Sequence, residues 1–254
     1  MKLIYMEQYR IDPTVAYDVL ELPSRGIHYA NKKKNLKVAY LTAVDENILS
    51  APNLIATQQV VTELLRRKII DKDLSIEDLV EEDKQAILIF LRNTAFGSEY
   101  KITTTDPKTE KEFTFEVDLS TLKTKDFTLE EDENGEYKYH MEKSKVNITF
   151  NFLNKKQEDE IDKIRESWNG NGIAPIITKQ LEFMIKSVAG NREPMQIRAF
   201  IEKMPIKDSQ DFRKFVIENK PGLDLTQKVI TPSGEEIQVN IGFGVEFFRP
   251  FYGL

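Results

Sequence analysis

Two stretches of the sequence, residues 76–107 and 201–232, resemble each other at a constant offset of 125 positions (201 − 76), without a gap. The identical pairs are Ile76 and Ile201, Glu77 and Glu202, Asp83 and Asp208, Gln85 and Gln210, Phe90 and Phe215, Gly97 and Gly222, and Pro107 and Pro232. A repeat at a fixed offset is typical of a duplicated structural unit, and it constrains the fold because both copies must fold alike. Seven identities in 32 positions also arise by chance, so duplication is a hypothesis at this point.

Each copy is predicted to be a helix followed by a β-hairpin. Asp83 and Asp208 are good N-cap residues, and Gly97 suits the left-handed residue that ends the first helix. Segments of alternating hydrophobicity then flank turns at residues 106–109 and 231–234. We therefore expect two similar helix-plus-hairpin units.

The remaining sequence predicts an α+β protein, with mixed helices and several β-hairpins. We expect strands at residues 15–22, 36–41 and 146–153, a hairpin of residues 126–129 with 137–141, and helices at residues 57–69, 155–168 and 176–188. The predicted division is between an α+β region, residues 1–153, and a mainly helical region, residues 154–254, each with one helix-hairpin unit.

Composition excludes several classes of protein. The 254 residues include no cysteine, which excludes disulfides and thiolate metal sites and is compatible with a reducing cytoplasm. No apolar run approaches the ~20 residues that a membrane span needs. Because Glu7 and Arg10 closely follow residues 1–5, we expect no signal peptide. The net charge of −6 argues weakly against a nucleic-acid-binding protein.

The sequence carries no motif of an enzyme. Its two histidines, His28 and His140, lie outside any metal-binding spacing, and neither Ser24 nor Ser209 stands in a nucleophile-elbow context. No phosphate-binding loop is present. We therefore expect no catalytic, cofactor-binding or metal-binding residue, and no cofactor.

A set of short motifs in a fixed order carries a family resemblance. The motifs are residues 22–26 (LPSRG), 41–43 (LTA), 52–54 (PNL), 221–224 (PGLD) and 247–250 (FFRP). In their order and spacing they resemble the baseplate hub proteins and hub-assembly factors of T4-like contractile-tailed phages. The resemblance implies a non-enzymatic tail assembly protein, either a chaperone or a virion component. Its partners would be other tail and baseplate hub proteins, in the host cytoplasm during assembly or in the virion.

The resemblance also implies a metal site that this chain has lost. Many members of the family carry a C-x-x-C pair in each hairpin turn, which nucleates a zinc knuckle. Here the matching residues are DPKT at 106–109 and TPSG at 231–234, so zinc is not expected. We expect strand pairing and packing alone to hold these hairpins. An alternative of another class is a nucleic-acid-associated regulator descended from a zinc-ribbon protein, using the basic residues 32–34 and 66–68.

Two segments are predicted to contact a partner. One is the turn at residues 23–29, and the other is the aromatic C-terminus, which either docks on the protein itself or inserts into a partner. Exposed hairpin edges are a further possibility through strand addition. The predicted contact residues are Pro23, Arg25, Tyr29, Phe247, Phe248, Arg249, Phe251 and Tyr252.

Overall fold

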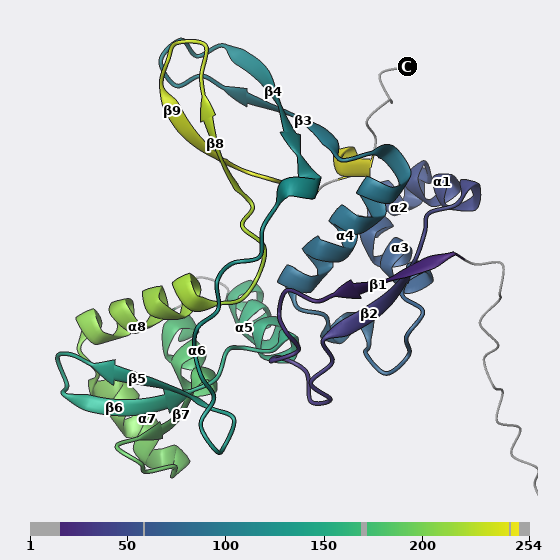
Figure 1. The fold of residues 1–254 in the computed structure, drawn as a ribbon. Helices are drawn as coiled ribbons and strands as arrows, with labels where there is room; N and C mark the ends of the chain where they lie inside the picture. Colours follow the sequence, from purple (N-terminus) through teal and green to yellow (C-terminus); the bar gives the residue numbers. More distant parts are fainter. Residues whose placement is uncertain (1–15, 58, 169–171, 244, 249–254) are drawn as a thin grey trace, which may run out of the picture.

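The computed structural model describes residues 16–57, 59–168, 172–243 and 245–248, and these form an α+β fold with several small antiparallel sheets (Figure 1). The first half of the chain contains β1 (Tyr17–Glu21), β2 (Asn35–Ala39), α1 (Ala43–Leu49), α2 (Pro52–Ala56), α3 (Val60–Lys68), η1 (Ile76–Asp78), α4 (Glu81–Phe96), β3 (Glu99–Thr105), β4 (Glu112–Asp118) and η2 (Leu119–Thr121). The second half contains β5 (Tyr137–Met141), β6 (Val146–Phe150), α5 (Lys155–Ser167), α6 (Ile176–Met184), β7 (Ile185–Val188), α7 (Pro194–Lys203), α8 (Ile206–Asn219), β8 (Thr226–Ile230), β9 (Glu236–Asn240) and η3 (Val245–Phe248).

The two halves share one order of elements, so the similarity extends well beyond the two repeated stretches. Each half begins with a β-hairpin, continues through helices, and ends with a helix followed by a second hairpin. The helices of the repeat, α4 and α8, begin at residues 81 and 206, which are 125 positions apart (206 − 81). In the second half β7 pairs with β6, and in the first half a single antiparallel bridge joins Ile69 to Val38 of β2.

A shared contact ties the opening hairpin of each half to its repeat helix. Asp83 accepts hydrogen bonds from the backbone N–H (2.9 Å) and the hydroxyl (2.6 Å) of Ser24. Asp208 accepts the same pair from Ser144, at 2.7 and 2.6 Å. The residue after each serine, Arg25 or Lys145, has a φ of 55°. Two hairpin turns with the same backbone conformation and the same carboxylate partner support a duplicated unit.

These contacts correct the prediction that Asp83 and Asp208 are N-cap residues. The N-caps of α4 and α8 are Val80 and Pro205, so each aspartate is the third residue of its helix. At that position a carboxylate is close to the positive end of the helix and can reach a neighbouring segment. The predicted end of α4 is confirmed, since Gly97 follows the helix with a φ of 84°.

Two hydrophobic clusters form the cores. The first contains α3, α4, β2 and the C-terminal Phe247 and Phe248, and the second contains β5, β6, β7 and parts of α6, α7 and α8. The predicted division between residues 153 and 154 stays a prediction. However, the buried side chains of β5 and β6, such as Phe150, pack with α6 and α8 rather than with the first half.

Two local predictions are wrong. The helix expected at residues 176–188 ends at Met184, and residues 185–188 form β7 instead. The β-branched Ile185 and Val188 pair with β6, where the sheet offers hydrogen bonds that override the helical spacing of the apolar residues. Residues 126–129 form no strand, and β5 pairs with β6 around the turn at residues 142–145.

Candidate interaction surfaces

Most of the predicted contact turn at residues 23–29 is buried or half-buried, and Arg25 is exposed. Pro23 is buried, and Tyr29 is 5% exposed and donates its hydroxyl to Asp83 at 2.5 Å. Burial raises the pKa of the Asp83 carboxyl, and the hydrogen bonds from Ser24 and Tyr29 only partly offset that effect. The loop thus supplies the hydrogen-bond donors that a buried carboxylate needs, and it contributes to the stability of the fold.

The same turn also contacts the second half of the molecule. Arg25 is exposed, and its guanidinium lies 5.5 Å from the centre of the Phe127 ring. The His28 Nδ1 atom is 2.9 Å from the carbonyl oxygen of Leu153, and burial lowers the pKa of His28 to about 4. A histidine with this pKa is neutral at physiological pH. Partner contact by Pro23, Arg25 and Tyr29 stays a prediction, for which Arg25 alone offers an exposed side chain.

The C-terminal aromatic segment docks on the first half of its own chain. Phe247 and Phe248 are 0% and 1% exposed. The Phe247 ring centre lies 5.0 Å from that of Tyr100 and 5.6 Å from the guanidinium carbon of Arg92. Arg92 is itself buried and donates to the carbonyl oxygens of Gly97 and Glu99, at 2.5 and 2.8 Å. Because these contacts bury Phe247 and Phe248, the two rings stabilise the first core.

The other predicted residues of the C-terminus, Arg249, Phe251 and Tyr252, lie outside the described residues. Their contact with a partner stays a prediction.

A half-buried ion cluster joins the two halves. The Lys220 ammonium, after α8, is 2.7 Å from Glu82 of α4 and 3.3 Å from Glu158 of α5. Burial lowers the pKa of Lys220, but the two carboxylates outweigh it, so the net shift is upward and the lysine stays charged. Nearby, a Cβ atom on Gly222 would lie 3.0 Å from the Glu82 side chain, which explains a glycine at this close approach.

The two repeat hairpins, β3–β4 and β8–β9, project together from the molecule and form a paired arm (Figure 1). Their turns meet at the positions that the resemblance assigns to zinc knuckles. Asp106 accepts hydrogen bonds from the Ser233 backbone N–H (3.1 Å) and hydroxyl (2.9 Å), and from the Lys108 N–H (2.9 Å) of its own turn. Among the described residues, no group of histidine and carboxylate side chains could hold a metal ion.

The expectation that strand pairing and packing alone hold the hairpins is therefore wrong. Asp106 is 1% exposed, and its burial raises the carboxyl pKa. Hydrogen bonds from Lys108, Ser233 and Thr109 outweigh that effect and leave the pKa below its usual range. A charged carboxylate that accepts several N–H groups thus links the two turns.

The paired arm leaves strand edges without a partner in the described part of the chain. β3 pairs only with β4 there, and β8 only with β9, in two sheets of two strands each. Along each strand the side chains alternate between exposed and half-buried, and Ile230 near the tip is 73% exposed. Open strand edges with apolar side chains are a template for strand addition by a second protein.

The basic segments of the nucleic-acid alternative are largely neutralised by acids. Lys68 is buried against Asp45, and Arg66 lies 2.7 Å from Glu63. In the other segment Lys33 lies 2.6 Å from Asp73. Cations held by carboxylates contribute little to a phosphate-binding surface.

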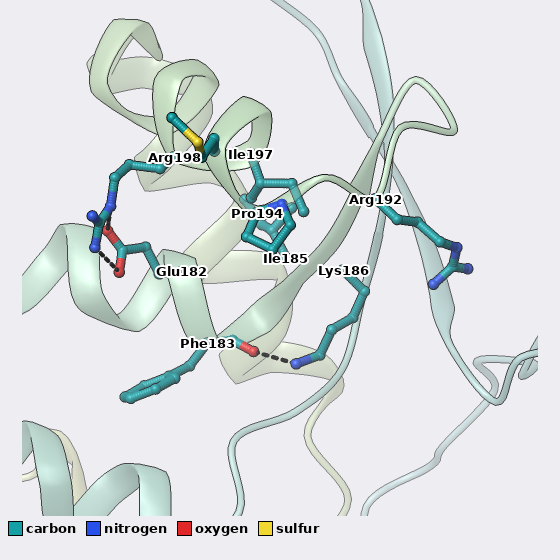
Figure 2. Close-up of a pocket in the computed structure, with 9 residues that line it drawn as sticks. Glu182, Phe183, Ile185, Lys186, Arg192, Pro194, Ile197 and Arg198 are labelled. Atoms are coloured by element: carbon teal, nitrogen blue, oxygen red, sulfur yellow. Dashed lines mark hydrogen bonds and ion pairs between the residues drawn. The ribbon is translucent and has the colours of Figure 1, made fainter.

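A pocket of about 480 Å³ lies between the end of α6, β7 and the start of α7 (Figure 2). Arg198 binds Glu182 at its rim, with N–O distances of 2.9 and 3.3 Å, and Lys186 donates to the carbonyl oxygen of Phe183. Figure 2 shows Arg192 directed away from these groups, where it binds Glu136 at 2.7 Å. The described lining residues include no serine or histidine, so the pocket holds no serine–histidine pair.

None of the helices in the described part of the chain combines the length and apolar composition that a bilayer span requires.

Comparison with known families decides the identity. The family model described as T4 bacteriophage base plate protein matches residues 24–249. The chain belongs to this family. A search of curated proteins and a search of solved structures each found no match.

Membership confirms the predicted relation to T4-like baseplate proteins. Membership in a baseplate family implies that the chain interacts with other phage tail proteins. The hub and the role in assembly are finer assignments, and they are taken up below.

Sequence reasoning missed the residues that organise these surfaces. The sequence predicts only that the turns at residues 106–109 and 231–234 lack metal ligands, and it does not predict the link between Asp106 and Ser233. A signal did exist for the anchoring aspartates, since Asp83 and Asp208 are one of the identical pairs of the repeat.

Proposed function

We propose that this protein is a non-enzymatic component or assembly factor of the baseplate hub, acting through protein–protein contacts. The paired arm is the observation that carries the proposal. Its tips project from the molecule while the base of β3–β4 packs into the first core through Val117. Its edges are open in the described residues, and an internal carboxylate link holds its two tips together. A preorganised arm binds a partner strand at a smaller entropy cost than two independent hairpins would.

The proposal assigns contact to the arm, and Ile230 offers a direct test. Ile230→Glu places a charge where an added strand would pack, and the side chain's exposure leaves folding unchanged. We expect the variant to fail in complementing a phage that lacks this protein, with baseplate assembly followed by electron microscopy. Met195→Glu is the matched control, since Met195 is 78% exposed on α7, away from the arm.

Mass spectrometry of purified particles separates the two forms of the proposal. A fixed copy number in the particle identifies a virion component, and absence from the particle together with an assembly defect identifies an assembly factor. Normal assembly without the protein would contradict both forms. Binding to DNA or RNA that weakens with salt in a gel shift would favour the nucleic-acid alternative instead.

A further inference from the structure

The repeat helices α4 and α8 differ in how completely they are covered. Seven residues of α4 are buried, whereas three residues of α8 are buried among the described residues. Position 92 of α4 corresponds to position 217 of α8 (217 − 92 = 125). Arg92 is 2% exposed beneath Phe247, whereas Ile217 is 70% exposed. One copy of this helix face is thus covered by the chain's own C-terminal segment, and the other copy is open.

The open face of α8 forms one wall of an apolar groove. The groove has a volume of about 400 Å³ and runs between α5, α6 and α8. Its apolar lining includes Ile177, Met184, Val216 and Ile217. An isoleucine that is 70% exposed beside such a groove is the kind of side chain that a binding partner covers.

The charges around the groove favour an acidic partner. Arg213 lines the groove, its Nε donates to the carbonyl oxygen of Ser209 at 3.2 Å, and no carboxylate pairs with it among the described residues. Arg165, across the groove, is paired with Asp162 at 2.5 Å. At the inner end Lys220 is shared by Glu158 and Glu82, so among the charged side chains that line the groove Arg213 is the one without an oppositely charged partner within the described chain.

We propose that this groove is a docking site for a short segment of another tail protein that carries aromatic side chains next to an acidic one. The segment lies on α8 around Ile217 as Val245–Phe248 lies on α4 around Arg92, with its aromatic ring in the groove and its carboxylate on Arg213. The inference rests on the proposed function for the partner's class. It adds the surface, the binding mode and the chemistry of the bound segment.

The test uses the full chain and a labelled synthetic peptide with the sequence of residues 241–248 (IGFGVEFF), which combines three aromatic residues with one acid. Binding is followed by fluorescence anisotropy. Ile217→Asp is expected to weaken binding by about tenfold or more, as loss of a central apolar anchor does. Ile206→Asp is the matched control, because Ile206 lies on the same helix, is 77% exposed and does not line the groove.

A charge exchange tests the proposed ion pair. Arg213→Glu is expected to weaken binding of the acidic peptide and to favour a peptide in which Glu246 is replaced by lysine. Equal binding by the wild type and by Ile217→Asp, or no binding by the wild type, would overturn the proposal. A concentration-dependent dimer that Ile217→Asp abolishes, measured by light scattering, would also overturn it and would assign the groove to a second copy.

The two proposals fail separately. If Ile217→Asp complements the phage fully while Ile230→Glu does not, the groove proposal is wrong and the proposed function stands. If baseplates assemble normally in the absence of the protein, the proposed function is wrong, whatever the peptide-binding result.

Discussion

The two halves of the molecule share one order of elements and differ in what covers the repeat helix. Each half anchors its opening hairpin with a carboxylate at the third position of its repeat helix, Asp83 or Asp208. The first half is finished by Phe247 and Phe248 from the end of the chain, whereas the corresponding face of the second half stays open. The two halves share the contact that anchors each opening hairpin and differ in the segment that covers the repeat helix.

The largest effect is expected from removing the internal cover. Phe247→Ala should lower the free energy of unfolding by about 3 kcal/mol, because the ring is fully buried and leaves a cavity. Ile217→Ala should change it by less than about 0.5 kcal/mol, since exposed side chains contribute little to folding. Urea unfolding measures both changes in the free energy of unfolding. Hydrogen exchange, followed separately in the two halves, shows which half loses stability. Equal costs at the two positions would remove the distinction between a covered and an open helix.

Removing the anchoring aspartate should also cost more stability in the first half than in the second. Asp83→Ala leaves the Ser24 N–H and hydroxyl and the Tyr29 hydroxyl without their acceptor in a buried site, which should cost about 3 kcal/mol. Asp208→Ala affects a turn nearer the surface, where water replaces the lost acceptor, so the cost should be smaller. Hydrogen exchange in β1–β2 and in β5–β6 measures each loss. A larger loss from Asp208→Ala would contradict this order.

Lowering the pH should change the stability of the two halves differently, because the pKa of Asp83 is raised and that of Asp208 is lowered. Burial raises the pKa of Asp208, but hydrogen bonds from Ser144 and Lys143 outweigh it, so the folded pKa lies below the unfolded one. Its stabilisation is therefore complete above the ordinary aspartate pKa of about 3.9, and it is lost as pH falls through the folded value. Asp83 has a raised pKa, so acid favours its folded, protonated form.

Urea unfolding at neutral pH and at about pH 3 checks this difference, with Trp168 fluorescence reporting on the second half. The stability gap between the wild type and Asp208→Asn should be largest at neutral pH and should shrink in acid. For Asp83→Asn the gap should not shrink in acid. A constant gap for Asp208→Asn would show that the carboxylate contributes no pH-dependent stability.

The smallest effect is expected at the tips of the paired arm, where corresponding turns of the two halves contact each other. Asp106→Ala removes the acceptor of the Ser233 N–H and hydroxyl, so β3–β4 and β8–β9 should exchange hydrogen faster while both cores keep their protection. Ser233→Ala should do the same to a lesser degree, because its backbone N–H remains. Faster exchange in the cores would mean that the arm stabilises them.

The repeat was visible in the sequence because its signals are local. The identical pairs fall on a helix and on the turn after it, where spacing, a helix-ending glycine and a proline mark positions in any protein. The α+β class and the absence of thiolate zinc ligands could be predicted on the same grounds. Residues 185–188 could not, because their apolar spacing fits a helix and only the neighbouring β6 makes them a strand.

The amino-acid sequence by itself determined the repeated helix-plus-hairpin arrangement and the family to which the chain belongs. Only the tertiary structure decided what each polar or aromatic side chain does within that plan. Asp83 meets Ser24 from 59 residues away, and Asp106 meets Ser233 from 127 residues away. Such contacts depend on how distant segments pack, and no local pattern encodes that. The burial of Phe247 is another such contact. An aromatic residue at this position is compatible both with packing on α4 and with binding to a partner, so the sequence alone does not distinguish the two.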